Sequence, residues 1–321
     1  MQKAVVLGIN GQDGSYLAEA LLNRGYDVIG IGRQARSQYV QASNHFHYAP
    51  LDLEDVDALE RLLAEADPDV AFHFAAVHGS SGFVYEPVWR SMMTVNVLTL
   101  HALLEHARTR RPAMRVVYAS SAKLFPQPLK GVIDEATPRR ATCLYGIGKL
   151  ASLDLISQYR DRQGIAASNL YFFNHESVRR GPEFFVPTVA RCLAAAIKDR
   201  TATISVESLN FRADWSSAAE LMDIAIDVAE KATNEDFVLA FGKTWHAREA
   251  VDALFRRYGL NYRDHIRELD PDRELGPEFR VSLARLRAMV GRQPVRDLFA
   301  IVDEMLERFG TSVSSVAVPG L

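Results

Sequence analysis

The sequence predicts an α/β fold: a doubly wound parallel sheet with a smaller lobe toward its C-terminal end. Three observations support this prediction. Short apolar runs alternate with longer amphipathic runs over the first 173 residues, which is the pattern of βαβ units. A glycine-rich stretch, Gly8-Ile-Asn-Gly11-Gln-Asp-Gly14, separates the first apolar run from the first amphipathic run. With 321 residues, 48% of them hydrophobic, the chain can bury a substantial core as one large domain or one and a half.

Strands and helices are expected to alternate through this N-terminal part. Short apolar runs predict strands at Ala4–Gly8, Asp27–Gly32, Phe46–Ala49, Val70–Phe74, Met114–Ser120 and Ala166–Phe172. Apolar residues at helical spacing predict helices at Tyr16–Arg24, Leu59–Ala66, Met92–Arg108 and Tyr145–Gln163. Because parallel strands need long crossover connections, these helices fit between successive strands of one parallel sheet.

The rhythm changes after Phe173. Residues 174–182 are polar and turn-rich, and helical and strand-like segments follow in looser order. We therefore expect residues 1–173 to form the core of a cofactor-binding domain. Residues 174–310 are expected to form mainly a substrate-binding lobe, with some excursions back to the sheet. Residues 311–321 are small and polar, and we expect a flexible tail there.

Composition excludes several classes of function. The net charge of −3 gives no electrostatic reason to expect nucleic acid as a partner. The two cysteines, Cys143 and Cys192, lack the spacing of a metal site or a disulfide framework, so no metal is expected. No apolar run approaches the length of a membrane span, and the N-terminus has no signal-peptide pattern. A cytoplasmic protein that does not bind membranes is therefore expected.

The glycine-rich stretch follows a predicted strand and opens a predicted helix, which is the context of a dinucleotide-binding turn in a Rossmann-type domain. Glycine permits the tight turn, and backbone N–H groups at the helix N-terminus can bind a pyrophosphate. The alternative is a turn that needs glycine only for packing. The turn residues expected to bind cofactor are Gly8, Asn10, Gly11, Gln12, Asp13 and Gly14.

The cofactor is predicted to be NADP(H). Sites that prefer NAD carry an acidic residue about 20 positions after the turn. Here the second strand leads into Arg33, with Arg36 close behind, and a guanidinium suits a 2′-phosphate better than a hydroxyl. NAD is the alternative if both arginines face solvent. Further cofactor contacts are expected from Asp52, Leu53, Phe74, Ala75 and Ala76.

The pair Tyr145 and Lys149 points to proton and hydride chemistry. Residues four apart lie on one face of a helix, so the ammonium can approach the phenol and favour its phenolate form. Ser120 and Ser121, at the end of a predicted strand, supply a hydroxyl that can hold a substrate alcohol. Together with a nicotinamide, this set predicts alcohol–ketone oxidoreduction.

This combination resembles the extended short-chain dehydrogenase/reductase superfamily, and within it the GDP-mannose 4,6-dehydratase family. The resemblance rests on Gly8–Arg33, Ala119–Ser121 with Tyr145 and Lys149, Phe173–Gly181, Asp214-Trp215 and Asp236–Gly242. It implies a Rossmann-type cofactor domain and a nucleoside-diphosphate sugar as substrate. It also implies a homodimer or homotetramer that assembles through the helices predicted at 92–108 and 145–163.

The resemblance further implies a role for each matching residue. Ser121 would hydrogen-bond the sugar C4 hydroxyl, Tyr145 would be its acid/base, and Lys149 would bind the nicotinamide ribose, with Tyr145 also beside the cofactor. Asn96 would lie near the active site. His175 and Glu176 would lie at the nicotinamide end, although a structural role for His175 is an equal alternative. The substrate-binding residues implied are Ser120, Ser121, Asn174, Arg180 and Arg212.

Two positions depart from the family pattern. The family carries a glutamate two residues after the strand-end hydroxyl, where a base is needed to remove the C5 proton during dehydration. Here that position is Lys123, which can act as a base only if its pKa falls by several units, and which otherwise faces solvent or phosphate. The family also carries an arginine where this chain has Ala213. Arg212 precedes it, on the opposite face of the strand by alternation.

The sequence therefore predicts an enzyme that transfers hydride at C4 of a nucleoside-diphosphate hexose or deoxyhexose, as a 4-ketoreductase or epimerase. Two alternatives stay open. One is an atypical 4,6-dehydratase that uses Lys123 in place of glutamate. The other is a catalytically inactive NADP-binding sensor, against which the intact Tyr145 and Lys149 argue.

Overall fold

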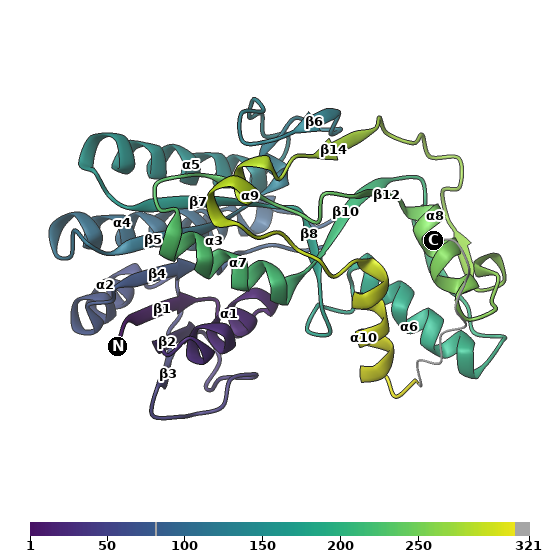
Figure 1. Ribbon diagram of the computed structural model, residues 1–321, viewed down its shortest axis with the longest axis horizontal. Coiled ribbons are helices and arrows are strands. Elements are labelled where there is room, and N and C mark those ends of the chain that lie inside the picture. The colour runs from purple at the N-terminus through teal and green to yellow at the C-terminus, as the bar shows by residue number, and fades with distance from the viewer. Residues whose placement is uncertain (81, 312–321) are drawn as a thin grey trace.

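A parallel sheet of seven strands, in the order β11-β7-β5-β4-β1-β2-β3, forms the centre of the molecule (Figure 1). The computed structural model describes residues 1–80 and 82–311, so the predicted tail lies outside the described residues apart from Thr311. The strands of the sheet are β1 (Lys3–Leu7), β2 (Asp27–Gly32), β3 (Phe46–Pro50), β4 (Val70–His73), β5 (Arg115–Ser121), β7 (Ala167–Phe172) and β11 (Phe237–Leu239). The chain order reverses between β1 and β4, and ligands bind at such reversals in open α/β sheets.

Helices cover both faces of this sheet, as its doubly wound topology requires. Alternate residues of β1 point to opposite faces: Val6 joins one hydrophobic cluster and Val5 the other. On the first face the cluster includes side chains of α1 (Gln12–Asn23), α7 (Ala218–Lys231) and α9 (Ala284–Val290). On the second face it includes side chains of α2 (Val56–Ala66), α4 (Thr99–Thr109) and α5 (Leu144–Gln163). The predicted fold class is confirmed.

The six predicted strands all form, each with ends within one residue of the prediction. The sheet also contains β11, which was not among the predicted strands. Helices α1 and α2 begin at least three residues earlier than predicted, at Gln12 and Val56. The first turn of α1 is polar, so no apolar period marks it. Asp55 caps α2 by accepting a hydrogen bond from the Ala58 backbone N–H at 2.9 Å.

The helix predicted at Met92–Arg108 forms, but it begins earlier, at Trp89, and a π-helical turn interrupts its α-helical hydrogen bonding. The segment is divided into a 3-10 turn η1 (Glu86–Val88), α3 (Trp89–Met93), a π-helical turn η2 (Thr94–Leu98) and α4. Apolar residues recur at helical spacing across this division, so the sequence pattern does not reveal the π turn. Such turns occur often at functional sites.

The lobe beyond the sheet is built around a smaller sheet of β8 (Asn174–Glu176), β10 (Arg212–Ser217) and β12 (Thr244–His246). A third hydrophobic cluster packs this sheet against α6 (Phe185–Lys198), α8 (Ala247–Arg256) and α10 (Leu298–Arg308). Figure 1 shows β8 and β10 leading out of the central sheet toward these helices. The remaining elements are β6 (Gly131–Ile133) paired with β14 (Phe279–Val281), β9 (Ile204–Val206) paired with β13 (Ile266–Glu268), η3 (Ala122–Leu124) and η4 (Tyr262–Asp264).

Within residues 1–80 and 82–311, no helix combines the length and the apolar character needed to cross a membrane.

Candidate active site

The glycine turn is packed too closely for any other residue. Gly8 has a φ of +90°, and a Cβ added there would lie 2.7 Å from the backbone nitrogen of Ala75, just after β4. A Cβ at Gly14 would lie 2.3 Å from the carbonyl oxygen of Gly8. The Gly11 N–H closes the turn by donating to that carbonyl at 2.9 Å. The N-terminus of α1 therefore sits directly on the carboxyl end of β1, an arrangement that fits the pyrophosphate of a dinucleotide.

Asn10 ties the loop after β2 to this turn. Its amide nitrogen donates to the Gln34 side chain at 2.9 Å and to the Arg36 carbonyl at 3.1 Å, and its oxygen accepts from the Gln38 backbone at 2.9 Å. The amide of Asn10, predicted to contact cofactor, is thus engaged in holding the loop. Arg33 and Arg36 lie on this loop with exposed side chains, close to the turn in space and open to an incoming phosphate.

The other residues predicted to contact the cofactor follow the third and fourth strands. Asp52 is exposed and accepts a hydrogen bond from the Glu54 backbone at 3.0 Å, while Leu53 is buried. Phe74 and Ala75 are buried where β4 ends, and Ala76 is exposed. The backbone after β4 passes against Gly8, as the contact at Ala75 requires, so this stretch borders the turn.

A partly buried ion pair joins the glycine turn to the first strand of the lobe. His175 Nε2 lies 3.0 Å from a carboxylate oxygen of Asp13, and its Nδ1 lies 2.8 Å from the Phe173 carbonyl. Burial opposes the charged form of each group, but the attraction and hydrogen bonding between the two groups outweigh the effect of burial. The pKa of Asp13 is therefore lowered and that of His175 is raised. Gln12 reinforces the link, since its side chain accepts from Ser177 at 2.8 Å. The protonated form of His175 is thereby favoured, and each ring nitrogen has a hydrogen-bond partner.

Tyr145 and Lys149 come together at the N-terminal end of α5, and both are buried. The Lys149 Nζ lies 5.6 Å from the centre of the Tyr145 ring. Burial lowers the pKa of Lys149 to about 7. Burial, followed by the nearby Tyr118 and Tyr85, raises the pKa of Tyr145 well above its usual 10. The expected pull of the ammonium toward a phenolate is thus outweighed by burial, and Tyr145 is a protonated phenol near neutral pH.

Ser120 and Ser121 end β5, with α5 packed beside that strand. The Ser120 hydroxyl is buried, and it has no hydrogen-bond partner within the described part of the chain. The half-buried Ser121 hydroxyl accepts from the Lys123 backbone N–H at 3.2 Å, which begins the turn η3. Lys123 itself is exposed. It therefore lacks the burial that would make a lysine a base, and the interpretation of Lys123 as a solvent- or phosphate-facing residue is favoured.

Asn96 lies in the π turn η2, buried beneath the site. Its side-chain oxygen accepts from the Val77 backbone at 3.0 Å. Its carbonyl oxygen accepts from Tyr118 at 2.8 Å and from Ser152 at 3.0 Å. The π turn thus presents a backbone carbonyl to two side chains, and it links α5 to β5.

The predicted substrate-binding residues are spread over the start of the lobe. Asn174 is exposed at the beginning of β8. Arg180 stacks on the Phe184 ring at 3.5 Å from its centre and lies 3.7 Å from a carboxylate oxygen of Glu176. Burial raises the pKa of Glu176 to about 7 despite that arginine. The Arg212 guanidinium lies 3.3 Å from a carboxylate oxygen of the exposed Glu278.

Three aromatic residues at the site were missed by the sequence reasoning. The rings of His78 and Tyr85 stack on Tyr145 at 4.5 Å and 5.6 Å, and His78 Nδ1 lies 2.6 Å from the Tyr85 hydroxyl. Tyr118 contacts Lys149 from β5. No local pattern marks these residues, since His78 and Tyr85 follow β4 without periodicity and Tyr118 reads as an ordinary strand residue. The only sequence signal for Tyr118 is its position two residues before Ser120.

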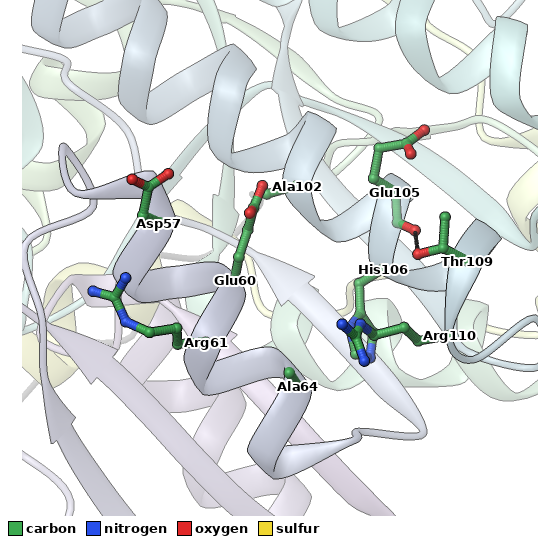
Figure 2. A pocket seen from close by; sticks show the side chains of 9 residues that line it. All are labelled: Asp57, Glu60, Arg61, Ala64, Ala102, Glu105, His106, Thr109 and Arg110. Carbon is green, nitrogen blue, oxygen red and sulfur yellow. Dashed lines mark hydrogen bonds between the residues drawn. The ribbon is translucent and has the colours of Figure 1, made fainter.

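One surface hollow lies away from this site. It has a volume of about 580 Å³ and is open to solvent between α2 and α4 (Figure 2). Its lining is Asp57, Glu60, Arg61, Ala64, Ala102, Glu105, His106, Thr109 and Arg110, none of which is a predicted site residue. The described residues also contain no cluster of three or more His, Cys, Asp or Glu side chains able to hold a metal ion.

Comparison with known proteins identifies related chains. A family profile described as GDP-mannose 4,6 dehydratase matches residues 5–290. The chain is similar to GDP-mannose 4,6 dehydratase 1 of Arabidopsis thaliana, with 29% identity over 284 residues that cover 83% of this chain and 77% of the relative. It is also similar to GDP-mannose 4,6-dehydratase of Vibrio cholerae, with 28% identity over 274 residues, 81% of this chain and 73% of the relative.

Solved structures share the fold at lower identity. A UDP-glucose 4-epimerase from Thermotoga maritima, solved with UDP-glucose, superposes with a TM-score of 0.82 at 18% identity, covering 96% of this chain and 98% of that one. A dTDP-glucose 4,6-dehydratase from Bacillus anthracis, solved with NAD, superposes with a TM-score of 0.80 at 16% identity, covering 97% of each chain.

Proposed function

The chain belongs to the GDP-mannose 4,6 dehydratase family, and from that premise we propose that it transfers hydride at C4 of a nucleoside-diphosphate hexose or deoxyhexose with NADP(H). We propose a 4-ketoreductase or epimerase in place of an ordinary dehydratase. The observation that carries the proposal is the buried pair Tyr145 and Lys149, with Lys149 bonded to the Ala119 carbonyl of β5, together with a glycine turn shaped for a dinucleotide.

Each part of the site has a proposed task. The turn from Gly8 to Gly14 would receive the pyrophosphate, and the exposed Arg33 and Arg36 would bind the 2′-phosphate of NADP(H). When bound, the nicotinamide supplies or accepts the hydride. Lys149 would donate a hydrogen bond to its ribose. The residues that follow β4, and Asp52 with Leu53, would border the adenosine.

Tyr145 would move the proton at the C4 oxygen while Ser121 holds that oxygen. Because burial keeps Tyr145 protonated near neutral pH, it is ready to give a proton to a C4 carbonyl oxygen. In the reverse direction the same oxygen would accept the proton from the C4 hydroxyl.

Dehydration would require a second proton-transfer group for C5 and C6. The nearest carboxyl groups after Ser121 along the chain are Asp134 and Glu135, and both accept hydrogen bonds from their surroundings. Asp134 accepts from the Ala136 backbone at 3.0 Å, and Glu135 accepts from the Val238 backbone at 2.8 Å. With Lys123 exposed, this favours reductase or epimerase chemistry.

An atypical 4,6-dehydratase is the second candidate. The similarity to GDP-mannose 4,6-dehydratases supports it, and so does Glu176, whose pKa of about 7 suits proton transfer at neutral pH. Lys123 would then replace the glutamate of the family. A catalytically inactive NADP-binding sensor is the third reading, and the buried Tyr145–Lys149 pair argues against it.

The test is to mix the protein with NADPH or NADP and a panel of GDP-, UDP-, CDP- and dTDP-hexoses and their 4-keto derivatives. Oxidation of NADPH by a 4-keto sugar supports a reductase, and exchange between C4 epimers supports an epimerase. A 4-keto-6-deoxy product without net cofactor change supports the dehydratase. Tight cofactor binding without turnover supports the sensor. Lys123→Ala separates the first pair from the dehydratase, since only the dehydratase needs that amine.

We also propose a homodimer or homotetramer in the cytoplasm. The side chains of Leu98, in the π turn, and Ile147, on α5, are 51% and 46% exposed, and a partner subunit would cover them. Both cysteines are free thiols, which fits a reducing compartment. Light scattering of the purified protein tests the assembly: a monomer at micromolar concentration contradicts it.

A further inference from the structure

A buried tyrosine on β5 holds the ammonium of Lys149. The Nζ of Lys149 donates to the Tyr118 hydroxyl at 3.0 Å and to the Ala119 carbonyl at 2.6 Å. The Tyr118 hydroxyl donates in turn to the Asn96 carbonyl at 2.8 Å. We propose that Tyr118 is a positioning residue for the proposed reaction, which fixes the Lys149 ammonium so that its third N–H faces the site. This inference rests on the role of Lys149 in the proposed function.

The direction of these hydrogen bonds follows from what each group can do. A phenol has one proton, and Tyr118 gives it to a carbonyl, which can only accept. The lone pairs of its oxygen are therefore left for Lys149, whose ammonium has three N–H groups. Tyr118 and Ala119 take two of them. One N–H remains for a ribose hydroxyl or for Tyr145.

The Asn96 carbonyl is itself fixed from several sides, so it anchors Tyr118 firmly. It lies in the π turn and accepts a second hydrogen bond from Ser152 of α5 at 3.0 Å. The side chain of the same asparagine accepts from the Val77 backbone at 3.0 Å. Tyr118 therefore connects three elements, β5, the π turn and α5, at the point where the ammonium sits.

Burial makes the ammonium depend on this hydroxyl. Tyr118 is fully buried, Lys149 is 1% exposed, and no ion pair of Lys149 occurs within residues 1–80 and 82–311. The Tyr118 ring also lies beneath the ammonium, with Nζ 4.4 Å from its centre. The charged form thus relies on one hydroxyl, one carbonyl and one aromatic face for its stabilisation.

The titratable groups that face Lys149 come from three places. Tyr118 lies on β5 and Tyr145 on α5. His73 of β4 packs edge-on against Tyr118 with ring centres 5.1 Å apart, and burial followed by the Lys149 charge lowers its pKa to about 3. The pKa of His78 is lowered to about 4, chiefly because its aromatic neighbours desolvate the ring. The positive charges of Arg180 and Lys149 lower it further. None of these groups titrates between pH 6 and pH 9.

The test compares Tyr118→Phe with Tyr171→Phe. Tyr171 is a second fully buried tyrosine, on β7, and its hydroxyl bonds Arg139 at 2.8 Å and Asp236 at 3.1 Å, with no contact to Lys149. Removing the Tyr118 hydroxyl removes an acceptor from the charged amine and lowers its pKa. If the pKa of Lys149 falls by about one unit, kcat at pH 7 falls by about fivefold. The alkaline midpoint of the pH profile of kcat then lies about one pH unit lower, and the substrate KM changes little.

Protein stability supplies a readout that does not need turnover. The ratio of the unfolding equilibrium constant of Y118F to that of wild type should be about fivefold larger at pH 6 than at pH 9. The reason is that the folded variant binds the Lys149 proton less well than folded wild type does. In a Lys149→Met background this extra pH dependence should vanish. Tyr171→Phe should lose stability equally at both pH values and keep the wild-type pH profile of kcat.

Equal pH dependence of stability and of kcat in wild type and Y118F would overturn the proposal. If wild type turns over no nucleotide sugar, the proposed function fails, but the stability comparison still decides whether Tyr118 holds the ammonium. If Y118F does not fold, 3-fluorotyrosine at position 118 keeps the hydroxyl and weakens it as an acceptor. The fluorinated variant should then shift the pH dependence of stability and of kcat in the direction expected for Y118F, by a smaller amount. Absence of any shift would contradict the inference.

Discussion

Replacing Lys149 by Met should stabilise the protein at acidic and neutral pH more than at alkaline pH. Burial lowers the pKa of Lys149 from its ordinary 10.5 to about 7 in the folded protein. Between these values the unfolded chain binds more protons than the folded protein, so the wild type gains stability as pH rises. Below pH 7 the full cost of the buried charge is present. Methionine carries no charge and avoids this cost at every pH.

The magnitude follows from the two pKa values. Each unit of pKa difference corresponds to about 1.4 kcal/mol, and integration from pH 6 to pH 9 gives about 2–3 kcal/mol. The advantage of K149M over wild type in the free energy of unfolding should shrink by that amount over this range. His73 and His78 titrate below the range and Tyr145 above it, so they cancel in the comparison.

Urea unfolding at pH 6, 7, 8 and 9, followed by tryptophan fluorescence, measures the difference directly. Lys130→Met, at an exposed position, is the matched control for replacing a lysine by methionine. A difference between K149M and wild type that is the same at pH 6 and pH 9 would refute the reasoning. The variant should also lose activity, so the buried amine is retained for function at a cost in stability.

Three further variants test separate parts of the site. Tyr145→Phe should lower kcat by about 10²- to 10⁴-fold with little change in thermal unfolding, and a kcat near that of wild type contradicts its role as acid/base. Replacing Arg33 and Arg36 by Ala should raise the Kd for NADPH by about 10- to 100-fold in a fluorescence titration and leave NADH unchanged, whereas an equal loss for both contradicts 2′-phosphate binding. Gly14→Ala adds a Cβ 2.3 Å from the Gly8 carbonyl oxygen and should destabilise the protein by about 1–3 kcal/mol; unchanged thermal unfolding contradicts the close packing.

Local signals were enough to predict most of the sheet. The strand at Asp27–Gly32 was predicted with its observed ends, because an apolar run between a polar turn and Arg33 limits it on both sides. The seventh strand, Phe237–Leu239, has only three residues, and pairing with β7 makes it a strand. The π turn at Thr94–Leu98 depends on contacts of the Asn96 carbonyl with Tyr118 and Ser152, which no helical period reveals.

The site divides in the same way between local and long-range signals. The four-residue spacing of Tyr145 and Lys149 and the glycine spacing were sufficient to predict two parts of it. The Asp13–His175 pair spans 162 positions and the Lys149–Tyr118 contact spans 31, so neither could be read from spacing. The protonation state of Tyr145 was predicted in the wrong direction. Burial, which sequence does not quantify, outweighs the ammonium there.

Hydride transfer at C4 is the central claim, and a deuterium label at that carbon tests it most directly. The protein, loaded with NADP, would be mixed with nucleoside-diphosphate hexoses carrying deuterium at C4, and reduced nicotinamide would be followed in a single turnover. We expect one of these sugars to form reduced nicotinamide with a primary isotope effect, and Tyr145→Phe to abolish the signal. Turnover of a sugar without a C4 isotope effect and without reduced nicotinamide would contradict the account.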